Sequence, residues 1–206
     1  MSREALDAAL GKWRANWPEW AIAELFVPHP LRETAVAWFA LLDEFARAAW
    51  GGSDPAPGLA KLAWWQEELR GWAKGARRHP LGMALQVHAV DWNRLADALS
   101  LLRDRDALVG EGTAVASTLP FAGVAASVES ELFGDTPVEA SRLARTLRVS
   151  TGWPVRGLAP AGGAKGPVPR RVLDALAELR MVATAKGRSL PRWRLPWVAW
   201  LAARSR

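Results

Sequence analysis

The chain of 206 residues contains no cysteine and no tyrosine, and it has only three histidines. The absence of cysteine excludes a disulfide framework, a thiolate metal site and a cysteine nucleophile, and it fits a reducing compartment. No stretch approaches the roughly 20 consecutive apolar residues of a membrane-spanning helix, and the charged first residues lack the apolar region of a signal peptide. We therefore expect a cytoplasmic protein.

Half of the residues are apolar, and the length suits one sizeable core, so we predict a single domain over residues 1–206. The 13 tryptophans stand beside only five phenylalanines. Large aromatic residues at helical spacing usually fill a core, which is the simpler interpretation. The alternative is that some of the indoles line a lipid cavity or form an interfacial belt.

Apolar residues recur every three or four positions, and no segment alternates convincingly with a period of two. This pattern predicts an all-α bundle of about seven or eight helices. Residues 31–50 are apolar on most sides, which is typical of a central helix. We also expect a helix from Pro80 to about Trp92, and a kink or break at Pro120 in a small-residue helix over 111–133.

The segment Leu62-Ala-Trp-Trp-Gln-Glu-Glu-Leu69 continues to His79-Pro80 and carries the most distinctive pattern in the chain. Its apolar residues share one helical face, and a helix is predicted to end near Gly75. That face consists of Leu62, Trp65, Leu69, Trp72 and Ala76.

Charged residues are sparse in the predicted central helix, which makes Asp43, Glu44 and Arg47 informative. Asp43 and Arg47 are four positions apart, the spacing of an ion pair within one helix turn. A satisfied structural pair is the simpler interpretation, and a ligand-binding role is the alternative. Arg145 and Arg148 lie in a basic stretch of the predicted helix that begins near Thr136-Pro137.

The positive charge gathers at the C-terminal end, where residues 165–206 hold 10 basic and 2 acidic residues. Within it, residues 190–206 form a basic tail that mixes tryptophan with arginine, as interfacial segments do. The tail is predicted to dock on the bundle, with peripheral membrane contact as the alternative. No nucleic-acid motif is present, so we expect no nucleic-acid partner.

Several segments in this order resemble the squalene/phytoene synthase family of all-α isoprenoid synthases, over about residues 30 to 160. They are Trp38-Phe-Ala-Leu-Leu-Asp-Glu-Phe-Ala-Arg47, Leu62-Ala-Trp-Trp-Gln-Glu-Glu-Leu69, Gly75 with His79-Pro80, Ala84-Leu85, Gly112-Thr-Ala114, and Leu147-Arg148 with Arg156-Gly157. The resemblance implies a shortened isoprenoid-synthase-like bundle.

The family's reaction uses two aspartate-rich motifs that hold Mg²⁺ against a substrate diphosphate. The first motif is missing near residues 46–50, and a shifted register recovers only Asp43 and Glu44. Where the second should follow Arg148, the chain reads Val149-Ser-Thr-Gly-Trp153. The pattern is most similar to the family's divergent branch, which includes relatives of complex I assembly factors that lack these aspartates.

The resemblance and the charges together predict a non-catalytic protein that binds an isoprenoid-like lipid or a protein partner. No catalytic residue and no metal ligand is assigned. The candidate ligand-binding residues are Asp43, Glu44, Arg47, Trp65, Glu68, Arg145 and Arg148.

Two alternatives stay open at this point. One is an active prenyl-diphosphate transferase with altered ligands, which alone would require Mg²⁺. The other is a membrane-surface adaptor that acts through residues 190–206.

Overall fold

A computed structural model describes residues 2–104, 114–152 and 165–205. These residues form helices and no β-strand, so the predicted all-α class is confirmed. Ten α-helices lie in the described ranges, and eight of them have seven or more residues. Predictions for residues 105–113 and 153–164 lie outside the described residues. The α-helices are α1 (Arg3–Asn16), α2 (Trp20–Ala23), α3 (Arg32–Trp50), α4 (Ala56–Trp72), α5 (Gly82–Leu85), α6 (Trp92–Ala98), α8 (Ala114–Phe133), α9 (Ala140–Ser150), α10 (Val168–Ala185) and α11 (Leu195–Arg204).

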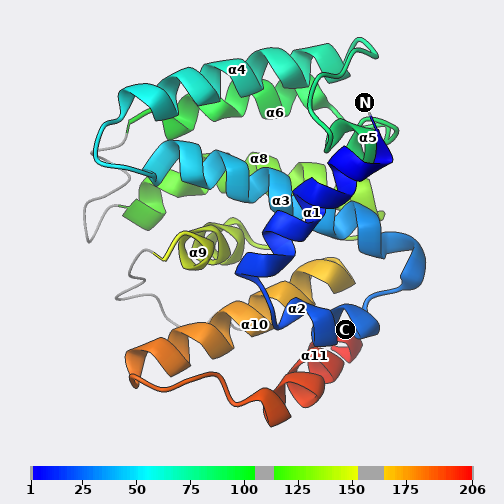
Figure 1. Ribbon diagram of the computed structural model, residues 1–206, viewed down its shortest axis with the longest axis vertical. Coiled ribbons are helices and arrows are strands. Elements are labelled where there is room, and N and C mark those ends of the chain that lie inside the picture. The colour runs from blue at the N-terminus through cyan, green and yellow to red at the C-terminus, as the bar shows by residue number, and fades with distance from the viewer. Residues whose placement is uncertain (1, 105–113, 153–164, 206) are drawn as a thin grey trace.

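Four short 3₁₀-helices complete the described secondary structure: η1 (Glu24–Phe26), η2 (His29–Leu31), η3 (Leu99–Leu102) and η4 (Arg192–Arg194). Figure 1 shows α4 and α6 at one end of the molecule, α3 and α8 across the middle, and α10 with α11 at the other end. Helix α9 connects the middle of the molecule to α10, because it contacts α3, α8 and α10. Helix α11 packs on α10 and on α2.

Helix α3 is the central helix, as its sequence predicts. Fifteen of its 19 residues are buried, because apolar side chains surround most of its circumference. The predicted face of α4 is also buried from Leu62 to Trp72, whereas Ala76 lies beyond the helix and is exposed. Gly75 adopts a φ of 83°, a left-handed conformation that favours glycine and that follows the helix end.

Of the expected kink or break at Pro120, the break does not occur, and the helix expected after Pro80 was wrong. Helix α8 continues through Pro120, which removes one main-chain hydrogen bond without ending the helix. Helix α8 packs against α6 and α9. The helix expected from Pro80 to Trp92 is reduced to the four residues of α5, and Asp91 caps a separate helix, α6, by accepting a hydrogen bond from the Arg94 amide.

Most of the tryptophans fill the core. Eight of them are buried, and the simpler interpretation of the unusual composition is confirmed for these residues: Trp13, Trp17, Trp20, Trp38, Trp50, Trp65, Trp72 and Trp92. Trp13 and Trp20 pack with Phe39 of α3 in edge-on and tilted arrangements, with ring centroids 5.5–5.7 Å apart. This aromatic cluster fixes the N-terminal segment against the central helix.

Helices α3 and α4 approach closely at Gly58, and this contact gives a first testable prediction. A Cβ atom at Gly58 would lie 2.1 Å from the main-chain oxygen of Ala48. Gly58→Ala is therefore expected to destabilise the protein by about 1–3 kcal/mol through overpacking, measured by urea unfolding.

The matched control is Gly11→Ala in α1, where a Cβ would meet nothing within 4 Å. There the added methyl is expected to stabilise the protein by roughly 0.5–1 kcal/mol, because alanine has the higher helix propensity. Equal effects of the two substitutions would contradict the close approach of α3 to α4.

Candidate functional site

Asp43 and Arg47 form the predicted ion pair within α3, with 2.7 Å between Arg47 Nε and Asp43 Oδ2. The Asp43 side chain is buried, whereas Arg47 is partly exposed. Burial raises the pKa of Asp43, and Arg47 offsets this only in part, so the pKa stays above its ordinary value. The pair is thus a local helix contact at the edge of the core.

Glu44 connects three helices. Its carboxylate accepts hydrogen bonds from Lys12 Nζ of α1 at 2.9 Å and from Lys61 Nζ of α4 at 2.5 Å. Burial alone would raise the pKa of Glu44, but the hydrogen bonds and charges of the two lysines lower it below its ordinary value. Asp43 and Glu44 are therefore both paired with cations of the protein.

Glu68 and Trp65 hold the turn that follows α4. The buried Glu68 carboxylate accepts hydrogen bonds from Trp72 Nε1 at 2.8 Å and from the main-chain amides of Arg78 and His79 at 2.7 and 2.8 Å. Trp65 packs against the His79 ring, with 4.6 Å between centroids. Desolvation by burial lowers the pKa of His79. Glu68 and Trp65 thus both contact residues of the turn that follows α4.

Asp43, Glu44 and His79 come together around a small cavity between α1, α3 and the turn after α4, with Lys12 on its wall. Its volume is about 100 Å³, below the ~300–1,000 Å³ of small-molecule sites. No group of three or more His, Asp or Glu side chains within the described ranges is arranged to hold a metal ion. With both carboxylates paired to lysine or arginine, these residues do not fit a Mg²⁺ site.

The two candidate arginines of α9 face different neighbours. Arg145 pairs with Glu178 of α10, at 2.5 Å between Nη1 and Oε1. Arg148 lies over the Trp50 ring, 5.8 Å from its centroid, and burial lowers its pKa. Arg148 thus contacts α3, the helix of Asp43 and Arg47, whereas Arg145 faces α10.

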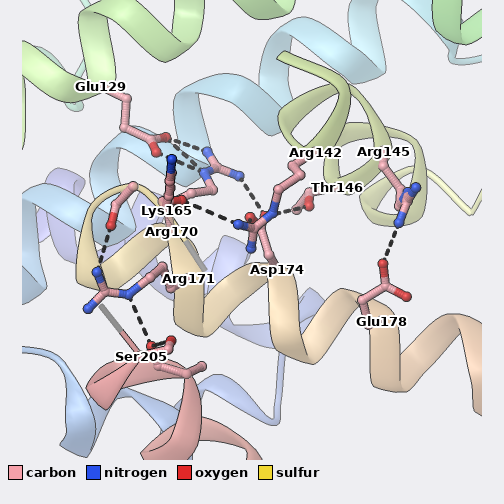
Figure 2. A network of polar contacts seen from close by, with 12 residues as sticks. Glu129, Arg142, Arg145, Thr146, Lys165, Arg170, Arg171, Asp174, Glu178 and Ser205 are labelled. Atoms are coloured by element: carbon pink, nitrogen blue, oxygen red, sulfur yellow. Dashed lines mark hydrogen bonds and ion pairs between the residues drawn. The ribbon is translucent and has the colours of Figure 1, made fainter. Parts of the chain in front are cut away.

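A buried ion pair that sequence reasoning missed joins α8 to α10. Arg170 is 1% exposed and Glu129 is not exposed at all. Arg170 donates to Glu129 through Nε and Nη2, at 2.9 and 2.5 Å, and Trp38 Nε1 of α3 donates to the same carboxylate at 2.7 Å. Figure 2 shows the two-pronged contact between Arg170 and Glu129. A single carboxylate thus connects three helices.

The network continues through Asp174, one turn after Arg170 on α10 (Figure 2). Asp174 accepts a hydrogen bond from the Thr146 hydroxyl at 2.7 Å, and its carboxylate lies 3.1 Å from Nη2 of Arg142. Burial raises the pKa of Asp174, and the charges of Arg170 and Arg142 offset this only in part. The sequence contains one signal for the buried ion pair: Glu129 is the first charged residue after the uncharged run 114–128.

A groove of about 540 Å³ opens beside this network, between α9, α10 and α11. Its apolar lining residues include Ala175, Val198 and Leu201. Its charged lining residues are Arg142, Arg145, Arg171, Asp174 and Glu178. Its volume falls within the ~300–1,000 Å³ of small-molecule sites.

The C-terminal tail docks on the bundle through one face of α11, where Leu195 and Ala199 are buried. Its opposite side forms an exposed surface, here called the C-terminal tryptophan face, which consists of Trp193, Trp197, Trp200 and Leu201. Their exposed fractions are 75%, 64%, 38% and 59%. No described helix is long and apolar enough to cross a membrane.

Comparisons with protein-family models, curated proteins and solved structures complete this description. None of them finds a match. The resemblance to squalene/phytoene synthases therefore stays a prediction from short sequence motifs, and the function has to be argued from the residues above.

Proposed function

We propose that this protein acts by binding, and that it attaches to an anionic lipid surface through the C-terminal tryptophan face. The observation that carries the proposal is the spacing of Trp193, Trp197, Trp200 and Leu201. At intervals of three and four residues these side chains share the outward side of η4 and α11. Exposed contiguous apolar surface of this kind marks interaction sites.

Cations surround this face and supply the preference for an anionic surface. Residues 186–204 contain five exposed cations and no acidic residue: Lys186, Arg188, Arg192, Arg194 and Arg204. Two of these arginines stack on tail indoles, since Arg204 lies 4.9 Å from the Trp200 ring and Arg194 lies 5.7 Å from the Trp193 ring. Indoles at headgroup depth beside guanidinium groups on phosphates are typical of interfacial attachment.

The predicted alternatives find less support. An active prenyl-diphosphate transferase would need carboxylates for Mg²⁺, whereas Asp43 and Glu44 are bound to Arg47, Lys12 and Lys61. That alternative still predicts Mg²⁺-dependent release of diphosphate from a prenyl substrate. Isoprenoid binding and membership of the divergent branch stay predictions as well.

Vesicle binding tests the proposal. The wild-type protein should sediment with vesicles that contain phosphatidylglycerol, and weakly with pure phosphatidylcholine. Trp197→Ser/Trp200→Ser should lower the partition coefficient at least about tenfold, since two indoles lose contact with the interface. Raising the salt concentration should weaken the binding, because each surface arginine contributes about 1 kcal/mol of screened attraction.

The matched control is Trp64→Ser, which removes another partly exposed indole, on α4. Figure 1 places α4 at the opposite end of the molecule from α11. This variant should bind vesicles like the wild type. If the wild-type protein ignores anionic vesicles, or if the double variant binds them equally well, the lipid surface is the wrong partner, and a protein partner for this face becomes the better proposal.

A further inference from the structure

We infer that the groove between α9, α10 and α11 binds a single-chain amphiphile with an anionic head. In this arrangement the head takes the place of the Glu178 carboxylate on Arg145, and the chain lies along the apolar side chains of α10 and α11. This site adjoins the outward tryptophan face, with which it shares Leu201. It goes beyond surface attachment because it takes one molecule into the protein.

The shape and the lining of the groove define the class of ligand. At about 540 Å³ it has room for one drug-sized molecule. The apolar side chains along it are Ala175, Ala177, Val198, Leu201 and Ala202. Its charged side chains come from α9 and α10. Binding sites of this kind are mostly apolar with a few placed polar groups that fix the orientation of the ligand.

The balance of charge selects an anion. Three arginines line the groove against two carboxylates. Arg142 pairs with Asp174 and Arg145 pairs with Glu178. Arg171 forms no ion pair with any carboxylate of the described ranges, and it donates to the main-chain oxygens of Ala202, Ala203 and Gly166 at 2.9–3.0 Å.

The charge of Arg171 is thus met by carbonyl dipoles at the end of α11 (Figure 2). Burial lowers the pKa of Arg171, and while Asp135 raises it, the charge of Arg142 lowers it further. Arg142 and Arg171 both line the groove, so their positive charges attract an anionic head that binds there.

The head group can take over the contact that Glu178 makes with Arg145. Its side chain is 36% exposed, whereas that of its partner Arg145 is 7% exposed. Glu178 can therefore rotate into water while Arg145 stays in the groove. An incoming phosphate or carboxylate replaces the Glu178 carboxylate on Arg145, so the buried guanidinium keeps an anionic partner throughout.

Calorimetric titration with dodecyl phosphate, below its micelle concentration and with the full-length protein, tests this inference. One molecule should bind per chain. Dodecanol, which lacks the anion, and inorganic phosphate, which lacks the chain, should each bind at least about tenfold more weakly.

Two substitutions in the groove are expected to change the affinity for dodecyl phosphate in opposite directions. Ala175→Phe fills the groove without a change of charge and should weaken binding at least about tenfold. Glu178→Gln removes the competing carboxylate and should strengthen binding about threefold to tenfold, an outcome that a folding defect cannot produce. Val182→Phe, at an exposed position of α10 outside the groove, is the matched control and should leave the affinity unchanged.

The inference is overturned if Ala175→Phe binds dodecyl phosphate like the wild type, or if Glu178→Gln fails to strengthen binding. It is also overturned if Trp197→Ser/Trp200→Ser abolishes the binding, because the amphiphile would then lie on the outward face. Failure of the surface proposal looks different: vesicle binding would be absent while dodecyl phosphate still binds in the groove.

Discussion

Replacing Arg170 with methionine is expected to lower the free energy of unfolding by about 3–5 kcal/mol. The substitution leaves the Glu129 carboxylate buried, with Trp38 Nε1 as its remaining donor among the contacts described above. An uncompensated charge at this depth is among the most destabilising changes that a single substitution can cause. For a chain of this length the melting temperature should fall on the order of 10 °C, as measured by circular dichroism.

The double variant Arg170→Met/Glu129→Gln separates lost charge from lost packing. Glutamine is neutral and keeps an oxygen that can accept from Trp38, so the double variant should recover more than half of the stability lost by the single one. If the two variants are equally unstable, the loss arises from the packing of Arg170, which lies 4.9 Å above the Phe39 ring, and the ion pair has little weight.

Glu68→Ala is expected to destabilise the protein by about 3 kcal/mol or more. The carboxylate accepts from Trp72 Nε1 and from two main-chain amides, and each donor left without an acceptor costs about 1–3 kcal/mol. Glu68→Gln keeps a neutral oxygen acceptor and should lose roughly half as much. Urea unfolding followed by circular dichroism measures both, and equal losses would show that the charge contributes nothing.

The pH dependence of this difference has a definite sign. Burial alone would raise the pKa of Glu68, but the hydrogen bonds from the Arg78 and His79 amides lower it in the folded protein. The stability that the ionised carboxylate contributes is therefore present above the unfolded pKa of about 4.3, and it is lost as the pH falls through the folded pKa. The stability difference between wild type and Glu68→Gln should be largest above about pH 5 and should shrink on acidification.

The fold was predictable where periodicity is strong. The central helix α3 and the buried face of α4 follow from apolar residues spaced for one or more helix faces. The boundaries that failed depend on tertiary packing. Pro120 is tolerated because neighbouring helices support α8, and the short α5 gives way to a separate helix that begins after the cap Asp91.

The candidate site was harder to predict, because single charges in a sequence do not identify their partners. Asp43 and Arg47 meet within one helix turn and were found, whereas Glu129 and Arg170 are 41 residues apart. The groove depends on how α11 folds back on α10, which no local pattern encodes. The tail was predicted to dock on the bundle, and Leu195 and Ala199 of α11 are buried there, whereas membrane contact stays a proposal.

The long-range contact between Arg180 and the N-terminal segment affects the order in which the chain can fold. Arg180 donates to Glu19 at 2.6 Å and stacks 3.9 Å above the Trp17 ring, across more than 160 residues. At a synthesis rate of about 5–20 residues per second, the ribosome needs on the order of 10 s to deliver Arg180 after Trp17 has been made. During that interval Trp17 and Trp20 lack their C-terminal cover, so the nascent N-terminal segment exposes apolar surface that chaperones can bind.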